Sequence, residues 1–307
     1  MIYKQLIETH PHLNIQLNHA LSDYSYTKTG GEADAIVFPT SKDEVKLIID
    51  WTNEQEIPLT ILGNLSNLIV RDGGIRGVVM ILTDMNSIEV EENYIYADSG
   101  ASIIEVSRTA RDYSLTGLEF ACGIPGSVGG AIFMNAGAYE GEIKDINVKI
   151  EAINRRGQFL TYTNQDAEFS YRHSVFQEND DIILGVSFEL SQGDLDQIQE
   201  KMDHLTHLRE SKQPLEYPSC GSVFKRPVGY YTGKLIQDAG LQGHRIGGAE
   251  ISRKHAGFII NVGGATATDY VEMIRYIQDT IWKLNSVRLE PEVRIIGQEV
   301  DTTNHSI

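Results

Sequence analysis

The stretch that decides the fold, residues 117–139, reads GLEFACGIPGSVGGAIFMNAGAY. Seven of the chain's 28 glycines lie between residues 117 and 141. A turn-rich linker does not need so many glycines at irregular spacing, whereas backbone that must approach a flat or charged ligand closely does need them. We therefore interpret this stretch as part of a binding site.

Helical and extended patterns alternate on both sides of this stretch. Residues 41–56 predict a helix, because Ser41 and Glu44 have capping-box spacing and an apolar face follows them. Strands are expected at 59–62, 76–82, 93–97, 148–154 and 181–189. Further helices are expected at 103–113, from 195 to a point before Pro214, and after Thr268-Asp269. This alternation indicates α/β or α+β architecture.

The apolar stripe of the long helix after Asp194 is the clearest of these patterns. It comprises Leu195, Ile198, Met202, Leu205 and Leu208.

The last ten residues of the chain are polar, and we expect them to be frayed.

Length and charge limit the possible functions. A chain of 307 residues suggests about two domains. With 26 Lys and Arg against 43 Asp and Glu, the net charge of −17 argues against binding to nucleic acid or to an anionic membrane. An anionic substrate would therefore need a local basic pocket.

Cysteines and apolar runs exclude several classes of protein. The two cysteines, Cys122 and Cys220, form no CxxC pair, which excludes a disulfide framework and a cysteine-rich zinc site. The N-terminus has no signal-peptide pattern, and the longest apolar run, 77–82, is far shorter than a membrane span. We expect a cytoplasmic protein without a membrane partner.

Several familiar motifs are absent or incomplete. No two glycines are spaced as G-x-G, so the Rossmann fingerprint is missing. His204 and His207 lack a nearby third ligand, so no metal site is expected. The segments 222–225 (S-x-x-K) and 28–30 (K-T-G) occur in the order opposite to that of penicillin-binding sites, and S-D-N is missing. We therefore reject a serine acyl-transfer site of the penicillin-binding type.

A second small-residue segment, 62–67 (LGNLSN), directly follows a predicted strand. Gly and Asn suit tight turns whatever the function. The same residues also suit a loop whose amides bind a diphosphate. The segment alone leaves both interpretations open.

The glycine-rich stretch resembles the UDP-N-acetylenolpyruvoylglucosamine reductases over 117–131 and 134–139. Other segments match the same family in the expected order, namely 62–67 before this stretch and 170–172 (SYR), 221–227 (GSVFKRP) and 290–293 (EPEV) after it. The matches span the chain from about residue 26 to 297. The resemblance implies an α+β protein with an FAD-binding domain of the vanillyl-alcohol-oxidase (PCMH) type, made of two α/β subdomains. These would occupy 1–82 and 83–192, followed by an α+β substrate-binding domain at 193–297 and a polar tail at 298–307.

The family reaction reduces UDP-N-acetylglucosamine enolpyruvate to UDP-N-acetylmuramate, a cytoplasmic step of peptidoglycan synthesis. The resemblance implies that NADPH is the electron donor and that FAD carries the hydride. We expect the FAD to be non-covalent, because the 63–67 loop has no histidine or cysteine to bond it. We also expect a monomer.

The family's functional residues can be carried over by position. The implied cofactor-binding residues are Gly63, Asn64, Leu65, Ser66, Asn67, Gly123, Pro125, Gly126, Ser127, Gly129, Gly130, Asn135, Gly137 and Ile183. Arg172 and Glu292 match the pair that stabilises developing charge, and Ser222 matches the proton donor. Lys212, Lys225 and Arg226 would form the basic pocket for the substrate's diphosphate and carboxylate.

The chain departs from the family pattern at two positions. Leu65 stands where the loop usually has glycine, and we expect an ordinary extended or right-handed backbone there. Arg226 stands where many members have asparagine. The short stretch between Arg172 and the helix near 194 leaves little room for the tyrosine-bearing loop of the longer branch and indicates the shorter branch.

Two other functions remain open from sequence. One is a flavin oxidase of the same fold with another substrate, which would be reoxidised quickly by oxygen without any nucleotide sugar. The other is a non-catalytic nucleotide-sugar binding protein, which would be colourless.

Overall fold

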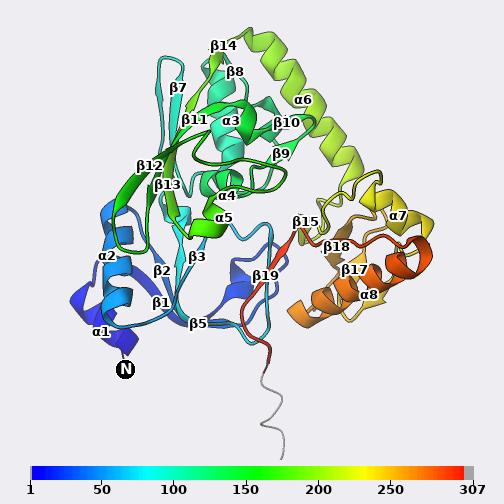
Figure 1. The fold of residues 1–307 in the computed structure, drawn as a ribbon, viewed down its shortest axis with the longest axis horizontal. Helices are drawn as coiled ribbons and strands as arrows, with labels where there is room; N and C mark the ends of the chain where they lie inside the picture. The colour runs from blue at the N-terminus through cyan, green and yellow to red at the C-terminus, as the bar shows by residue number, and fades with distance from the viewer. Residues whose placement is uncertain (1, 301–307) are drawn as a thin grey trace, which may run out of the picture. The chain divides into compact units, whose positions relative to one another are not determined.

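The computed structural model describes residues 2–300, which fold into mixed helices and strands (Figure 1). The α-helices are α1 (Ile2–Thr9), α2 (Lys42–Glu54), α3 (Ile103–Asp112), α4 (Val128–Phe133), α5 (Phe176–Asn179), α6 (Leu195–Lys212), α7 (Thr232–Asp238) and α8 (Ala267–Asn285). Short 3-10 helices are η1 (Leu21–Asp23), η2 (Leu82–Asp84), η3 (Glu119–Ala121) and η4 (Ile143–Asp145). Among residues 2–300, no helix is both long enough and apolar enough to cross a bilayer.

The strands alternate with these helices along the chain. The first are β1 (Asn14–Ala20), β2 (Glu32–Phe38), β3 (Leu59–Leu62), β4 (Leu68–Val70), β5 (Ile75–Ile81), β6 (Ile88–Glu91), β7 (Tyr94–Asp98), β8 (Leu115–Thr116), β9 (Gly137–Ala138) and β10 (Gly141–Glu142). The others are β11 (Asn147–Ile153), β12 (Phe159–Thr163), β13 (Ile182–Glu189), β14 (Ser191–Gln192), β15 (Ser219–Ser222), β16 (Arg245–Ile246), β17 (Ala249–Ile251), β18 (Phe258–Asn261) and β19 (Arg294–Ile296).

The chain divides into two compact units. The first comprises 1–17, 35–64 and 77–209, and the second comprises 18–34, 65–76 and 210–307. This grouping differs from the three-domain division expected from sequence, whose boundaries stay a prediction. The segment 62–67 is divided between the units after Asn64.

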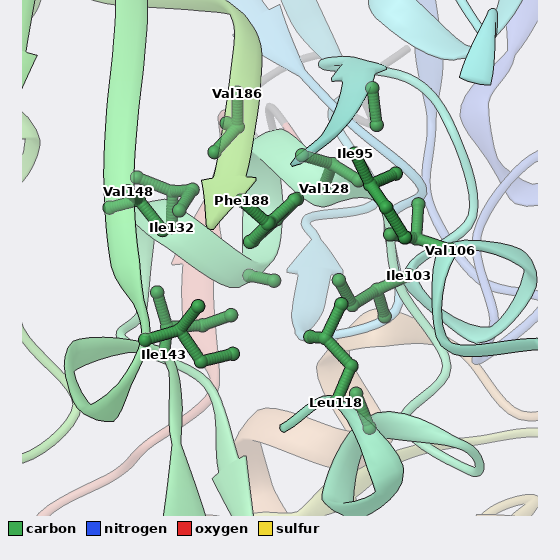
Figure 2. Packing of buried hydrophobic residues seen from close by; sticks show 14 of the residues in the cluster. Ile95, Ile103, Val106, Leu118, Val128, Ile132, Ile143, Val148, Val186 and Phe188 are labelled. Atoms are coloured by element: carbon green, nitrogen blue, oxygen red, sulfur yellow. The ribbon is translucent and has the colours of Figure 1, made fainter. Parts of the chain in front are cut away.

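The first unit contains a five-stranded antiparallel sheet ordered β12-β11-β13-β7-β6. A bulge in β11 falls between Glu151 and Ala152. Figure 2 shows hydrophobic side chains from this sheet, from α3 and from α4 converging in one cluster, among them Val186, Phe188, Val106 and Ile132. Burial of this apolar surface anchors α4, and with it the glycine-rich stretch, against the sheet.

A second core in the same unit forms around α2. Ser41 Oγ accepts a hydrogen bond from the Glu44 amide and so caps the helix. The helix then buries one face, including Val45, Ile48 and Ile49. Most of the four-stranded sheet ordered β1-β2-β5-β3 belongs to this unit, and β3 runs parallel to β5 directly before Gly63.

The second unit is built on an antiparallel sheet ordered β15-β18-β17-β16, beside which α8 lies (Figure 1). Thr266 caps α8 in a capping box with Asp269. The Asp72 carboxylate adds bonds from the amides of Ala267 and Thr268 at 2.9 and 2.8 Å. These contacts fix β4, which follows the 65–67 segment and pairs in parallel with β19.

The expected α+β class is confirmed, and most expected elements are present within one or two residues. The last helix begins at Ala267, before the expected start after Thr268-Asp269, because Thr266 is its cap. Leu195 was expected in the buried stripe of α6 but is 47% exposed, whereas Ile198, Met202 and Leu205 are buried. Of the polar tail, residues 301–307 lie outside the described residues.

Candidate active site

The glycine-rich stretch forms the turn that leads into α4. Ser127 caps this helix by accepting a hydrogen bond from the Gly130 amide. The amides of Val128 and Gly129 donate to the carbonyls of Ala101 and Ser99, each at 2.8 Å. The amides of Gly129 and Gly130 thus already have acceptors within the protein, and the contact of these two residues with FAD stays a prediction.

Other amides of the same turn keep their donor capacity. Within residues 2–300, the N–H groups of Gly123, Gly126 and Ser127 donate to no protein acceptor, and neither does that of Gly63. Gly63 lies against Ser127, since a Cβ at residue 63 would be 2.5 Å from Ser127 Oγ. Pro125 has no amide hydrogen to donate.

A pocket of about 330 Å³ opens beside this turn in the first unit. It is lined by Asn64, Thr83, Asn86, Ile88, Gly100, Ser102, Glu105 and Gly126. Backbone amides without an internal acceptor, next to a pocket, are the donors that a diphosphate needs. The residues of this turn therefore fit the diphosphate of FAD.

Asn135 is fully buried, and its side chain has three protein partners. Its Nδ2 donates to Glu142 Oε2 at 2.7 Å and to the Ser170 carbonyl at 2.9 Å, and its Oδ1 accepts from the Lys144 amide at 2.9 Å. The side chain thus supports the Ser170 turn, so a contact with a cofactor would have to come from its backbone. The Ile183 side chain likewise lies in the core of the sheet.

Arg172 lies in a tight turn in which Ser170 and His173 exchange two backbone hydrogen bonds of 3.1 Å. Its φ of 56° is in the left-handed region, which costs about 1–2 kcal/mol for a residue with a Cβ. Its Nη2 donates to the Gly137 carbonyl at 3.1 Å, and its own carbonyl accepts from Gln177. Such strain persists where the surroundings fix it, and it is common at functional sites.

The structure contradicts the expectation for Leu65. Its φ is 48°, in the left-handed region, and its side chain is only 3% exposed. A leucine is held there because its apolar side chain is buried, while its carbonyl accepts from the Tyr26 amide. The amides of Leu65, Ser66 and Asn67 donate to no acceptor among residues 2–300.

Ser222 and Glu292 lie on two neighbouring segments of the second unit. Phe224 and Pro291 form an antiparallel bridge, and the Lys225 amide donates to the Glu290 carbonyl at 2.9 Å. The Glu292 amide donates to the Val223 carbonyl at 2.7 Å. These backbone contacts make neighbours of the two segments that carry Ser222, the predicted proton donor, and Glu292, which is predicted to stabilise charge.

Asn67 joins the same cluster from a distant part of the sequence. Its Nδ2 donates to the Glu292 carbonyl at 3.3 Å, and its carbonyl accepts from the Arg294 amide at 3.1 Å. Its side chain thus fixes the backbone of Glu292, a role that the sequence did not indicate.

Sequence reasoning also missed His255, which lies close to Ser222. A Cβ at Gly257 would be 3.1 Å from His255 Cε1 and 3.9 Å from Ser222 Oγ. His255 Nδ1 accepts from the Gly257 amide at 3.1 Å, so its hydrogen is on Nε2. Burial lowers the pKa of His255 below 6.5 and keeps the ring neutral. A lone histidine in the sequence carries no spacing signal that could reveal this.

The three predicted substrate-binding cations also belong to the second unit. Lys225 Nζ lies 3.8 Å from Glu290 Oε2. The Arg226 guanidinium lies 3.9 Å from the centre of the Tyr231 ring, and Lys212 is exposed at the end of α6. Among residues 2–300, no group of three or more His, Cys, Asp or Glu side chains could hold a metal ion.

Comparisons with known proteins show to which family the chain belongs. The domain model "UDP-N-acetylenolpyruvoylglucosamine reductase, C-terminal domain" matches residues 213–296, and the model "FAD binding domain" matches residues 33–163. The UDP-N-acetylenolpyruvoylglucosamine reductase of Latilactobacillus sakei is 57% identical over 293 residues, which cover 95% of this chain and 97% of that protein. The protein of the same name from Staphylococcus aureus is 53% identical over 297 residues, covering 97% of each.

A solved structure shows the same overall fold. It is a UDP-N-acetylenolpyruvylglucosamine reductase from Thermus caldophilus, with a TM-score of 0.79 and 31% identity, covering 92% of this chain and 98% of that chain. The expected FAD-binding domain and the expected family are confirmed. Since relatives more than half identical match nearly its whole length, the chain belongs to the UDP-N-acetylenolpyruvoylglucosamine reductase family.

Proposed function

We propose that this protein reduces UDP-N-acetylglucosamine enolpyruvate to UDP-N-acetylmuramate with NADPH as the electron donor. The observation that carries the proposal is the pairing of 223–225, which follow Ser222 directly, with 290–293, in a chain 57% identical to a named reductase. This pairing supports a joint role for Ser222 and Glu292. Bound FAD would supply the hydride chemistry that connects NADPH with the enolpyruvyl ether.

The chain's own residues would bind and orient the substrate and move one proton. Hydride adds to the methylene carbon of the double bond, and Ser222 donates a proton to the neighbouring carbon. A serine hydroxyl is a weak acid, so it needs a strongly basic acceptor or a polarising neighbour. We propose Glu292 as that neighbour, since its backbone amide donates to the carbonyl of Val223, the residue after Ser222, at 2.7 Å.

Arg172 is proposed to meet the negative charge that develops on the substrate's carboxylate. Its guanidinium is already oriented by the Gly137 carbonyl, so little reorganisation is needed during the reaction. Removing one such preorganised donor typically slows a reaction about 10²–10³-fold.

The substrate's diphosphate is proposed to bind to Lys212, Lys225 and Arg226. Arginine and lysine form charge-assisted hydrogen bonds with phosphate oxygens. Arg226 is supported by the Tyr231 ring, and its Nε also donates to the Tyr230 carbonyl at 3.4 Å. This local positive charge offsets the acidity of a chain with a net charge of −17.

One experiment tests the proposal against both alternatives. The purified protein should be yellow, and it should oxidise NADPH rapidly only when UDP-N-acetylglucosamine enolpyruvate is added. Fast oxidation of NADPH by oxygen without the nucleotide sugar would favour an oxidase. A colourless protein that binds the nucleotide sugar would be a non-catalytic binding protein, and either result would overturn the proposal.

The proposal extends to assembly and location. The reaction consumes a nucleotide sugar and NADPH, so we place the protein in the cytoplasm, and we propose that it acts as a monomer. Light scattering during size-exclusion chromatography should give a mass near 34.2 kDa, and a mass twice as large would contradict the monomer.

A further inference from the structure

Arg209, on the last turn of α6, lies directly over the glycine-rich turn. A Cβ at Gly123 would be 2.8 Å from Arg209 Cδ, 3.4 Å from Nη1 and 3.6 Å from Nε. Contacts below 3.0 Å essentially never occur for a real Cβ, so any other residue at position 123 would force the Arg209 side chain to shift.

The Arg209 guanidinium is half-buried but has no protein partner that could neutralise it. Within residues 2–300 it makes no ion pair and donates no hydrogen bond. Its charge interacts with the hydroxyl of Tyr139 and the thiol of Cys122, and burial lowers the pKa of the Arg209 guanidinium. A partly desolvated cation without a partner is unfavourable unless an anion binds beside it.

Arg155 shows how the same unit treats a comparable arginine. It is also half-buried, but its Nη1 donates to the Leu59 carbonyl at 3.2 Å, and Asp180 and Asp181 stabilise its charge. The contrast indicates that Arg209 lacks the hydrogen-bond acceptor and the acidic neighbours that the protein provides for Arg155.

The surroundings of Arg209 match a site for an anionic ligand. The amides of Gly123, Gly126 and Ser127 on the same turn have no acceptor among residues 2–300, and Gly126 lines the pocket of the first unit. We propose that Arg209 carries the positive charge that binds a negatively charged group of FAD beside Gly123. This inference rests on the proposed placement of FAD in the first unit.

The test uses the holoenzyme and three variants. Arg209→Met removes the charge at similar length, Arg209→Lys keeps the charge, and Arg155→Met is the matched control. FAD release on dilution is followed by flavin fluorescence, and the midpoint potential of bound FAD is measured against a reference dye. Neither readout needs turnover.

We expect Arg209→Met to raise the dissociation constant of FAD about 10–100-fold, the loss expected for a charge-assisted hydrogen bond. Arg209→Lys should recover most of the affinity, and Arg155→Met should leave it unchanged. Equal weakening of oxidised and reduced FAD would assign Arg209 to the diphosphate. If reduced FAD lost about ten times more affinity than oxidised FAD, the midpoint potential of bound FAD would fall by about 30 mV. That result would assign Arg209 to the negatively charged ring of reduced FAD.

Unchanged affinity and unchanged potential in a folded Arg209→Met protein would overturn the proposal. Equal loss of FAD in Arg155→Met would also overturn it, since the effect would then reflect general destabilisation. If the unaltered protein bound no FAD, the proposed function itself would fail. The two failures are therefore distinguishable.

Discussion

Leu65 provides the sharpest test of the backbone conformation in the 62–67 loop. Its φ of 48° penalises any residue with a Cβ, yet its side chain is 3% exposed and so contributes buried apolar surface. Leu65→Ala removes the buried side chain and keeps the strain. Leu65→Gly removes both. The difference between the two variants therefore isolates the backbone conformation.

The magnitudes follow from these two features. Loss of a buried leucine side chain costs about 2–5 kcal/mol, so both variants should be less stable than the original protein. In the left-handed region, glycine escapes a penalty of about 1–2 kcal/mol but adds about 0.5–1 kcal/mol of unfolded-state freedom. Leu65→Gly should therefore be more stable than Leu65→Ala by roughly 0.5–1 kcal/mol.

The assay is thermal unfolding of the FAD-saturated protein, followed by circular dichroism. A difference of 1 kcal/mol corresponds to about 2–4 °C in a protein somewhat smaller than this one, so Leu65→Gly should melt about 1–2 °C above Leu65→Ala. Leu62, 5% exposed in β3, is the matched control. There the order should reverse, because glycine weakens a strand. If Leu65→Gly melts below Leu65→Ala, as at Leu62, the left-handed assignment is wrong.

Three further predictions concern the cofactor and the second unit. Acid precipitation should release the yellow colour into the supernatant, and colour left on the pellet would indicate covalent FAD. Ser222→Ala should leave flavin reduction by NADPH unchanged and slow reoxidation by the enolpyruvyl substrate about 10²–10⁴-fold in stopped-flow absorbance, whereas Ser219→Ala on the same strand should affect neither step. Equal slowing of both steps by Ser222→Ala would show that the serine is structural. Because the folded pKa of His255 is depressed, its stabilising contribution is present above pH 6.5 and lost as the pH falls below that value. Between pH 7 and pH 5, the melting temperature of the original protein should therefore fall more than that of His255→Gln. Parallel plots of melting temperature against pH for the two proteins would contradict a buried neutral ring.

Local signals in the sequence were sufficient for most of the fold. Ser41 and Glu44 located the start of α2, because a cap and an apolar face are both encoded within a few residues. The start of α8 was misplaced because two threonines lie near it, and only the structure shows that Thr266 pairs with Asp269. Leu195 was assigned to the buried stripe of α6 from its spacing alone, but exposure depends on what packs against the first turn.

The candidate site was less accessible, because its key contacts join distant residues. Asn67 holds the backbone of Glu292 across 225 positions, and no periodicity in a single sequence reports such a pair. The same is true of Arg209 over Gly123. The resemblance to a family supplied candidate roles for Arg172, Ser222 and Glu292, whereas the partners that orient those residues came only from the structure.

The glycines at 117–141 serve the protein's own packing more than the sequence suggested. A Cβ at Gly129 would be 2.2 Å from Ser99 Oγ, one at Gly137 would be 2.7 Å from Glu142 Cβ, and one at Gly141 would be 2.8 Å from the Phe120 side chain. With Gly123 against Arg209, each of these glycines lies where an added Cβ would force a protein neighbour to shift. Close packing in turn uses the amides of Gly129 and Gly130, whereas those of Gly123, Gly126 and Ser127 donate to no acceptor among residues 2–300. The glycine pattern therefore encodes a tightly packed turn, and we expect a diphosphate to bind where this packing leaves donors unused.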